Sequence, residues 1–165
     1  LPRVFAGEFD SLVLDMALTP EITDSVGYYL AKAEVTARLD IPAFSHAYYD
    51  SARTILERQV EALPEDPELH SRLGLAYAGL GLRQDAIREG TEATRLRPVS
   101  EDAVDGPLAV ETLARIYAML GDTDTAIDRL EMLLSIPSHL SRESIRLDPI
   151  WEPLREHERF ARILR

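Results

Sequence analysis

The four histidines are the side chains whose type most readily suggests metal binding or acid–base chemistry. They are His46, His70, His139 and His157. A zinc-binding helix needs two histidines four residues apart, because both must reach one metal from the same face. No pair has that spacing, and His157 and Glu158 have no second histidine to complete an H-E-x-x-H motif. We therefore expect no metal site, and histidines that are either hydrogen-bonded or exposed.

An acidic run offers a second kind of metal chemistry. Asp122, Asp124 and Asp128 begin like a calcium-binding loop. Such a loop needs Gly at its sixth position and Glu at its twelfth, where this chain has Ile127 and Leu133. We predict instead that a helix begins here, because acidic side chains stabilise the positive end of a helix dipole.

Motifs for nucleophilic catalysis and phosphate binding are missing from the sequence. It has no cysteine, so thiol catalysis and Cys-ligated metals are excluded. Gly74, Gly79 and Gly81 are not followed by the Lys-Ser/Thr of a phosphate loop, and no G-x-S-x-G elbow occurs. We expect a protein that is not an enzyme and binds no cofactor. An enzyme built on a helical array stays open as an alternative, and it requires a pocket with convergent polar groups.

Charge and hydropathy narrow the choice of partner. The 165 residues include 18 Lys and Arg against 29 Asp and Glu, a formal net charge of −11. Nucleic acid and anionic lipid attract clustered basic residues, so we expect neither as a partner. No apolar run approaches the ~18 residues that membrane insertion needs. We expect a cytoplasmic location, with the outer side of a membrane-anchored parent left open. Because the chain begins with Leu1, we expect it to be either processed or cut out of a longer protein.

The elements that would position any site repeat along the chain. At an offset of 40 residues the matches fall on small, apolar and turn-forming residues, which is typical of a packing repeat. The matched pairs are Pro67 and Pro107, Leu73 and Leu113, Tyr77 and Tyr117, Ala78 and Ala118, Leu80 and Leu120, Gly81 and Gly121, Ala86 and Ala126, and Ile87 and Ile127.

Each repeated unit has the pattern of two helices. Apolar residues at three- and four-residue steps predict a helix over Pro67–Leu80, with Asp66 as its N-terminal cap and Gly81 at the turn that follows. A second helix is predicted over Gln84–Leu96, before Pro98. Such a hairpin cannot bury its apolar stripe alone, so we expect it to stack on its neighbours.

The stretch from Asp66 to Pro98 resembles a tetratricopeptide repeat (TPR). Leu73, Gly74, Tyr77, Gly81, Ala86, Ala93 and Pro98 match the family's 34-residue pattern, whereas His70 and Gly90 depart from it. The resemblance implies an all-α fold, a right-handed α-solenoid of antiparallel helix hairpins. The array spans residues 1–138, with a half repeat at 1–20, a degenerate unit at 21–65 and units at 66–99 and 107–138; capping helices follow at 139–165.

Nearly the whole chain also resembles a narrower group. The strings YAGLGLRQDAIREG, DAVDGP, LLSIP and LDPIWEPLREHERF are similar to the C-terminal TPR region of large bacterial signalling proteins. In those proteins the region follows a protein-kinase, nucleotide-cyclase or winged-helix domain. The resemblance implies a non-catalytic scaffold for protein–protein interaction in a larger regulatory protein.

The first helices of TPR hairpins line a concave groove that binds a peptide or helix. The resemblance places eight residues of this chain there: Glu34, Arg38, Glu68, Ser71, Leu75, Glu111, Arg115 and Met119. They lack the Lys, Arg and Asn set with which some TPR proteins clamp a terminal carboxylate, so we expect no chaperone-tail binding. A homodimer through the half repeat at Leu1–Ala17 is the alternative.

Two residues allow two interpretations each. Gly90 lies inside a predicted helix, where it indicates either a close approach of helices or a notch for a partner. Trp151, the one tryptophan, is either a core residue of the terminal helices or an interface anchor.

Overall fold

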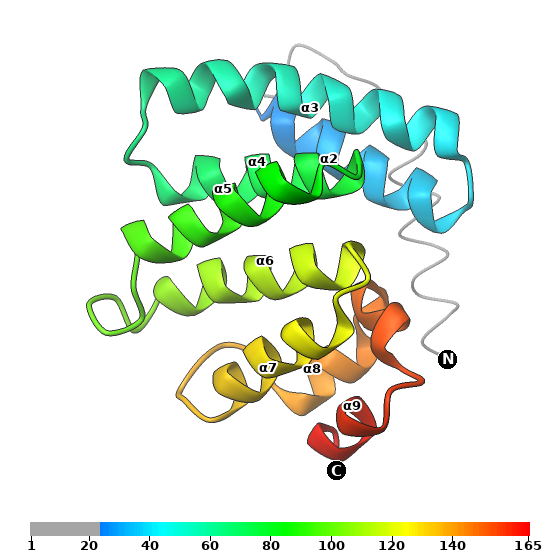
Figure 1. The fold of residues 1–165 in the computed structure, drawn as a ribbon, viewed down its shortest axis with the longest axis vertical. Coiled ribbons are helices and arrows are strands. Elements are labelled where there is room, and N and C mark those ends of the chain that lie inside the picture. The colour runs from blue at the N-terminus through cyan, green and yellow to red at the C-terminus, as the bar shows by residue number, and fades with distance from the viewer. Residues whose placement is uncertain (1–23) are drawn as a thin grey trace.

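The computed structural model describes residues 24–165, so the expected half repeat at residues 1–20, with its self-association surface, lies outside the described part. The described chain is all-helical and contains no strand, which confirms the all-α expectation. Figure 1 shows the helices in order. They are α2 (Ser25–Arg38), α3 (Pro42–Ala62), α4 (Pro67–Gly79), α5 (Arg83–Leu96), α6 (Gly106–Met119), α7 (Thr123–Leu134), α8 (Arg142–Leu147), the 3-10 helix η1 (Pro149–Leu154) and α9 (Glu158–Ile163).

Aspartate side chains begin several of these helices. Asp66 accepts a hydrogen bond of 2.9 Å from the backbone N–H of Glu68, and Pro67 is the first residue of α4, as the sequence predicts. Asp122 likewise accepts from the N–H of Thr125 at the start of α7, so this acidic run does begin a helix. These caps satisfy backbone donors that the first helical turn leaves without partners.

The same turn ends the first helix of each of the three pairs α2/α3, α4/α5 and α6/α7. Its central residue has a left-handed backbone, with φ of 55° at Asp40, 73° at Gly81 and 73° at Gly121. In each turn, the N–H of the next residue donates to the carbonyl five positions earlier. These bonds run from Ile41 to Thr36, from Leu82 to Tyr77 and from Asp122 to Tyr117, each 2.9 Å long. This arrangement is a Schellman motif, and it recurs at the repeat spacing.

Burial follows the repeat as well. Residues 71–80, in α4 and its C-terminal cap, and residues 111–120, in α6 and its cap, alternate between buried and half-buried side chains in an identical order. Residues 30–39 of α2 follow that order for their first six positions and then become exposed at Ala37, Arg38 and Leu39. The end of α2 is therefore uncovered where the corresponding ends of α4 and α6 are packed.

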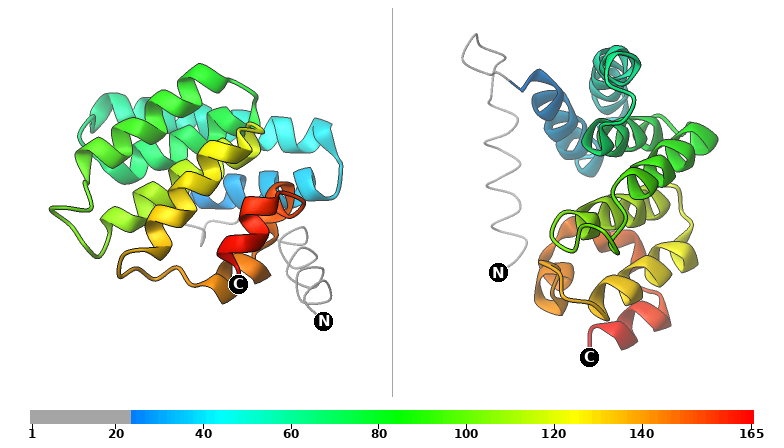
Figure 2. Two further views of the ribbon diagram at one scale, coloured as in Figure 1. Left: turned by 60° about the horizontal axis from the view of Figure 1, so that its bottom comes forward. Right: turned by 90° about the vertical axis from the view of Figure 1, so that its left-hand side faces the viewer.

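From α2 to α7, helices that are consecutive in the chain pack together, and α4 lies against α3, α5 and α6 (Figures 1 and 2). Small residues allow the close approach. A Cβ added to Gly90 would lie 2.7 Å from Cδ1 of Ile116 and 2.9 Å from Cδ1 of Leu113, both on α6. Gly90 thus admits the neighbouring helix, which confirms the first of its two interpretations and leaves no notch.

The C-terminal helices pack against α6 and α7. Trp151 of η1 is fully buried, in a core cluster that includes Leu130 of α7, Ile145 of α8 and Phe160 of α9. Its interpretation as a core residue is confirmed. Arg159 of α9 adds polar contacts to α7, donating to carboxylates of Asp124, Asp128 and Glu131.

Candidate functional site

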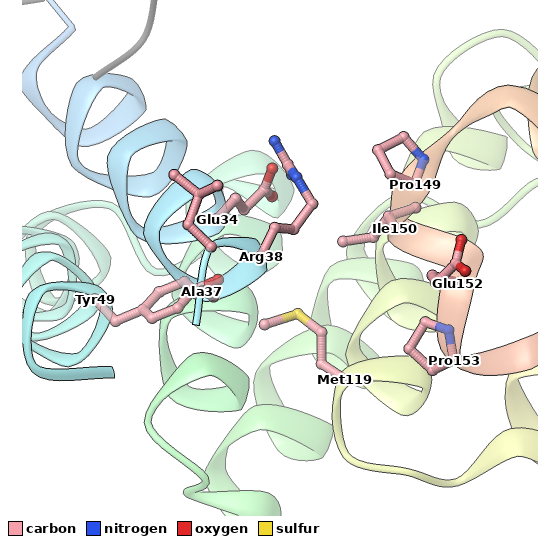
Figure 3. A pocket seen from close by; sticks show the side chains of 10 residues that line it. Glu34, Ala37, Arg38, Tyr49, Met119, Pro149, Ile150, Glu152 and Pro153 are labelled. Carbon is pink, nitrogen blue, oxygen red and sulfur yellow. The ribbon is translucent and has the colours of Figure 1, made fainter. Parts of the chain in front are cut away.

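A pocket of about 750 Å³ opens at the exposed end of α2. One wall comes from α2 and α3, the other from η1, and Met119 of α6 lies between them (Figure 3). Most of the lining side chains are apolar. The ten residues that line the pocket are Glu34, Ala37, Arg38, Leu39, Tyr49, Met119, Pro149, Ile150, Glu152 and Pro153.

Three of the eight groove residues expected from the sequence meet in this pocket. They are Glu34 and Arg38 of α2 and Met119 of α6. Met119 and Arg38 occupy the same position in their repeats, two residues before the left-handed residue of the turn. The repeat register therefore places them on corresponding faces, from which both reach the same space.

The three expected groove residues on α4 lie elsewhere. Glu68 is exposed and forms an ion pair of 2.8 Å with Arg72, one turn further along the same helix. Ser71 is buried, with 6% of its surface exposed. Leu75 packs against the core cluster that contains Ile116 of α6. None of the three lines the pocket.

Glu111 and Arg115, the remaining two, connect α6 to the C-terminal helices. Glu111 is buried and contacts Arg115 at 2.8 Å and the ring of His139 at 2.5 Å. Arg115 also contacts Asp148 at 3.1 Å, and its guanidinium lies over the ring of Trp151, 6.0 Å from its centroid. These side chains hold η1 against α6, and so they position the pocket wall that η1 supplies.

Glu34 is the half-buried carboxyl of the pocket. Burial raises its pKa above the ordinary value, while the positive charges of Arg115 and Arg38 lower it and Asp148 raises it. Burial also raises the pKa of the neighbouring Tyr49 hydroxyl, with a further contribution from the charge of Glu34. Burial therefore makes the ionised form of Glu34 energetically unfavourable in the pocket.

Tyr49 forms the α3 side of the pocket because Gly79 makes room for it. A Cβ on Gly79 would collide with the Tyr49 ring. Gly79 lies in α4, where it admits the buried tyrosine ring. The ring therefore lines the α3 side of the pocket, next to the exposed end of α2.

Sequence reasoning did not find the η1 wall. Pro149 and Pro153 predict short capping helices, and that much is observed. Nothing in their spacing indicates that Ile150 and Glu152 face α2, which lies more than a hundred positions earlier in the chain. The apolar residues around Trp151 were the available signal that this segment packs into the fold.

Three of the four histidines, His70, His139 and His157, have structural partners, and His46 is exposed on α3. His70, at the position of the TPR tryptophan, is buried; its Nδ1 lies 2.6 Å from a carboxylate oxygen of Glu89 and its Nε2 lies 2.9 Å from the carbonyl of Pro64. His157 caps α9 by accepting from the N–H of Arg159. Among residues 24–165, no three His, Asp or Glu side chains gather as a set that could hold a metal ion.

Comparison of the chain with protein-family models, with curated proteins and with solved structures gives no match. The function is therefore argued from the pocket and the repeat. Over the part of the chain that the structure describes, no helix is both long enough and apolar enough to cross a membrane.

Proposed function

We propose that this chain is a non-catalytic protein–protein interaction module that binds a peptide or helix in the pocket between α2 and η1. The observation that carries the proposal is the pocket itself, in which three of the eight residues that the TPR resemblance assigns to a groove come together, namely Glu34, Arg38 and Met119. Its volume of about 750 Å³ and apolar lining suit anchoring side chains of a protein segment.

The proposal includes the finer architecture. We infer a TPR-type right-handed α-solenoid of antiparallel hairpins, located in the cytoplasm as the scaffold of a larger bacterial regulatory protein. The recurrence of one Schellman turn at Asp40, Gly81 and Gly121 supports the repeat. Stacked hairpins of this kind present a continuous concave surface, and binding through such a surface needs no reactive side chain.

The test fills the pocket without disturbing the core. Ala37 is exposed on the pocket wall, so Ala37→Trp places an indole where the partner is expected. We expect peptides selected from a displayed 15-residue library against the unmodified protein to bind the A37W variant at least about tenfold more weakly.

Ala43→Trp is the matched control, because Ala43 is exposed on the neighbouring helix α3 and does not line the pocket. Selected peptides should bind this variant as they bind the unmodified protein. If both variants lose peptide affinity equally, or if both retain it, the result contradicts a binding site in the pocket.

A further inference from the structure

The pocket combines an apolar surface with a carboxylate, Glu34, that has no hydrogen-bonded or ion-paired partner among the described residues. Glu34 forms no hydrogen bond and no ion pair with any residue of the described range 24–165. The positive charge of Arg115 lowers the pKa of Glu34, but the guanidinium of Arg115 already forms ion pairs with Glu111 and Asp148. Arg38 lies one turn further along α2, and its positive charge lowers the pKa of Glu34.

The surface that leads to Glu34 is apolar. Met119 lies between the walls, Ile150 projects from η1, and Tyr49 lies behind Ala37 (Figure 3). A second carboxylate, Glu152, stands on the opposite wall, where it also pairs with Arg155 at 2.7 Å. The lining therefore carries two acidic groups against one basic group, in a chain whose net charge is −11.

A long basic side chain matches both properties. Lysine has a four-carbon apolar stem that packs on apolar surface, and a terminal ammonium that forms an ion pair with a carboxylate. An apolar side chain would leave Glu34 desolvated without a partner, and an acidic side chain would be repelled by Glu34 and Glu152.

Resting on the proposed function, we propose that the pocket accepts a lysine side chain of the partner peptide, with its ammonium paired to Glu34 and its stem packed against Met119 and Ile150. The electrostatics of Glu34 agree with this. A bound cation offsets the burial that raises the pKa of Glu34, so the carboxyl gives up its proton more readily when the pocket is occupied. Binding should therefore tighten as the pH rises through the pKa of Glu34.

The test compares three acetylated and amidated heptapeptides, Gly-Ser-Ala-X-Ala-Ser-Gly, in which X is lysine, norleucine or glutamate. Norleucine keeps the apolar stem of lysine and lacks its charge. Binding is followed by two-dimensional amide NMR of the full chain, reading the resonances of Ala37, Met119 and Ile150. We expect the lysine peptide to bind about tenfold more tightly than the norleucine peptide, and the glutamate peptide to bind most weakly.

The variant Glu34→Gln keeps the shape of the side chain and removes its charge. We expect E34Q to bind the lysine and norleucine peptides equally. Glu101→Gln, which removes the same charge from an exposed position in the loop before α6, should leave the preference for lysine unchanged.

Three results overturn the inference: no preference for lysine, a preference that survives in E34Q, or no shift of the pocket resonances with any peptide. If norleucine binds as well as lysine and A37W blocks both, the interaction module stands and the lysine assignment fails. If library peptides also ignore A37W, the proposed function itself fails.

Discussion

At the scale of single residues, polar groups that the helices bury are placed beside partners. His70 and Glu89 bond to each other, and Arg88 donates to the second oxygen of Glu89 at 2.9 Å. Removing one partner from such a buried pair leaves the other desolvated, which costs more than the pair contributes. Two groups are exceptions among the described residues: the carboxyl of Glu34 faces the pocket without a bonded partner, and the buried Nε1–H of Trp151 has none.

The raised pKa of Glu34 predicts a pH dependence of stability. Between the ordinary value of 4.5 and the raised value, the folded chain holds a proton that the unfolded chain has released. The free energy of unfolding therefore falls as the pH rises through this window. Glu34→Gln removes this dependence, so we expect the variant to gain stability relative to the unmodified protein from about pH 4 upward, and then to level off.

Urea unfolding at several pH values measures this difference. Glu101→Gln again serves as the control, because it removes the same charge from an exposed position. A difference for Glu34→Gln that is constant across the range would contradict the burial of this carboxyl.

At the scale of elements, the turn after each first helix sets the repeat. A left-handed backbone suits glycine, and aspartate tolerates it better than most residues because its short side chain bonds locally. Asp40 therefore takes the place of Gly81 and Gly121 without changing the hydrogen bonds of the turn. This explains why the first described unit has a degenerate sequence and yet folds as the others do.

The turn positions give a reciprocal prediction. Asp40→Gly should raise the free energy of unfolding by about 1 kcal/mol, because glycine removes the left-handed strain. Gly81→Asp should lower it by a similar amount, and no side chain stands near the added Cβ. Chemical unfolding measures the free energy of unfolding of both variants. If the two substitutions changed it in the same direction, the turns would not be equivalent.

Local rules were enough to predict the helices and part of the site. Asp66 and Gly81 mark helix ends through backbone hydrogen bonds alone, so the sequence reveals them. Glu34 and Met119 follow from the repeat register. The opposite wall does not, because Ile150 reaches the pocket only through the way the C-terminal segment packs across α6. That packing depends on tertiary contacts of Trp151, which no periodicity encodes.

At the scale of the whole molecule, the fold is a series of neighbouring contacts. One core cluster joins α2, α3 and α4, another joins α4, α5 and α6, and a third joins α6 and α7 to the C-terminal helices. Arg115 is the polar link of the third cluster, since it connects α6 to Asp148 and covers Trp151. In such an array a local change should propagate only to adjacent elements.

Arg115→Met tests this locality. The side chain of Arg115 is 28% exposed, and its removal leaves Glu111 and Asp148 without a shared cation. We expect a loss of about 1–3 kcal/mol in stability. Amide hydrogen exchange should accelerate in α8, η1 and α9, while exchange in α3 and α5 stays unchanged.

Arg95→Met is the comparison, because Arg95 is 66% exposed and, within residues 24–165, forms its ion pair with Glu92 on its own helix. It should change stability by less than about 0.5 kcal/mol. Acceleration spread evenly over all helices of Arg115→Met would indicate a single cooperative unit instead of an array.

The burial of Trp151 gives the protein an optical reporter of its own. It is the sole indole in the chain; it is fully buried, its Nε1–H has no hydrogen-bond partner among the described residues, and Arg115 lies over its ring. Its fluorescence should therefore be blue-shifted in the folded state. Since Trp151 lies between two residues that line the pocket, Ile150 and Glu152, its emission should respond when a ligand moves η1, so that binding can be followed without a dye.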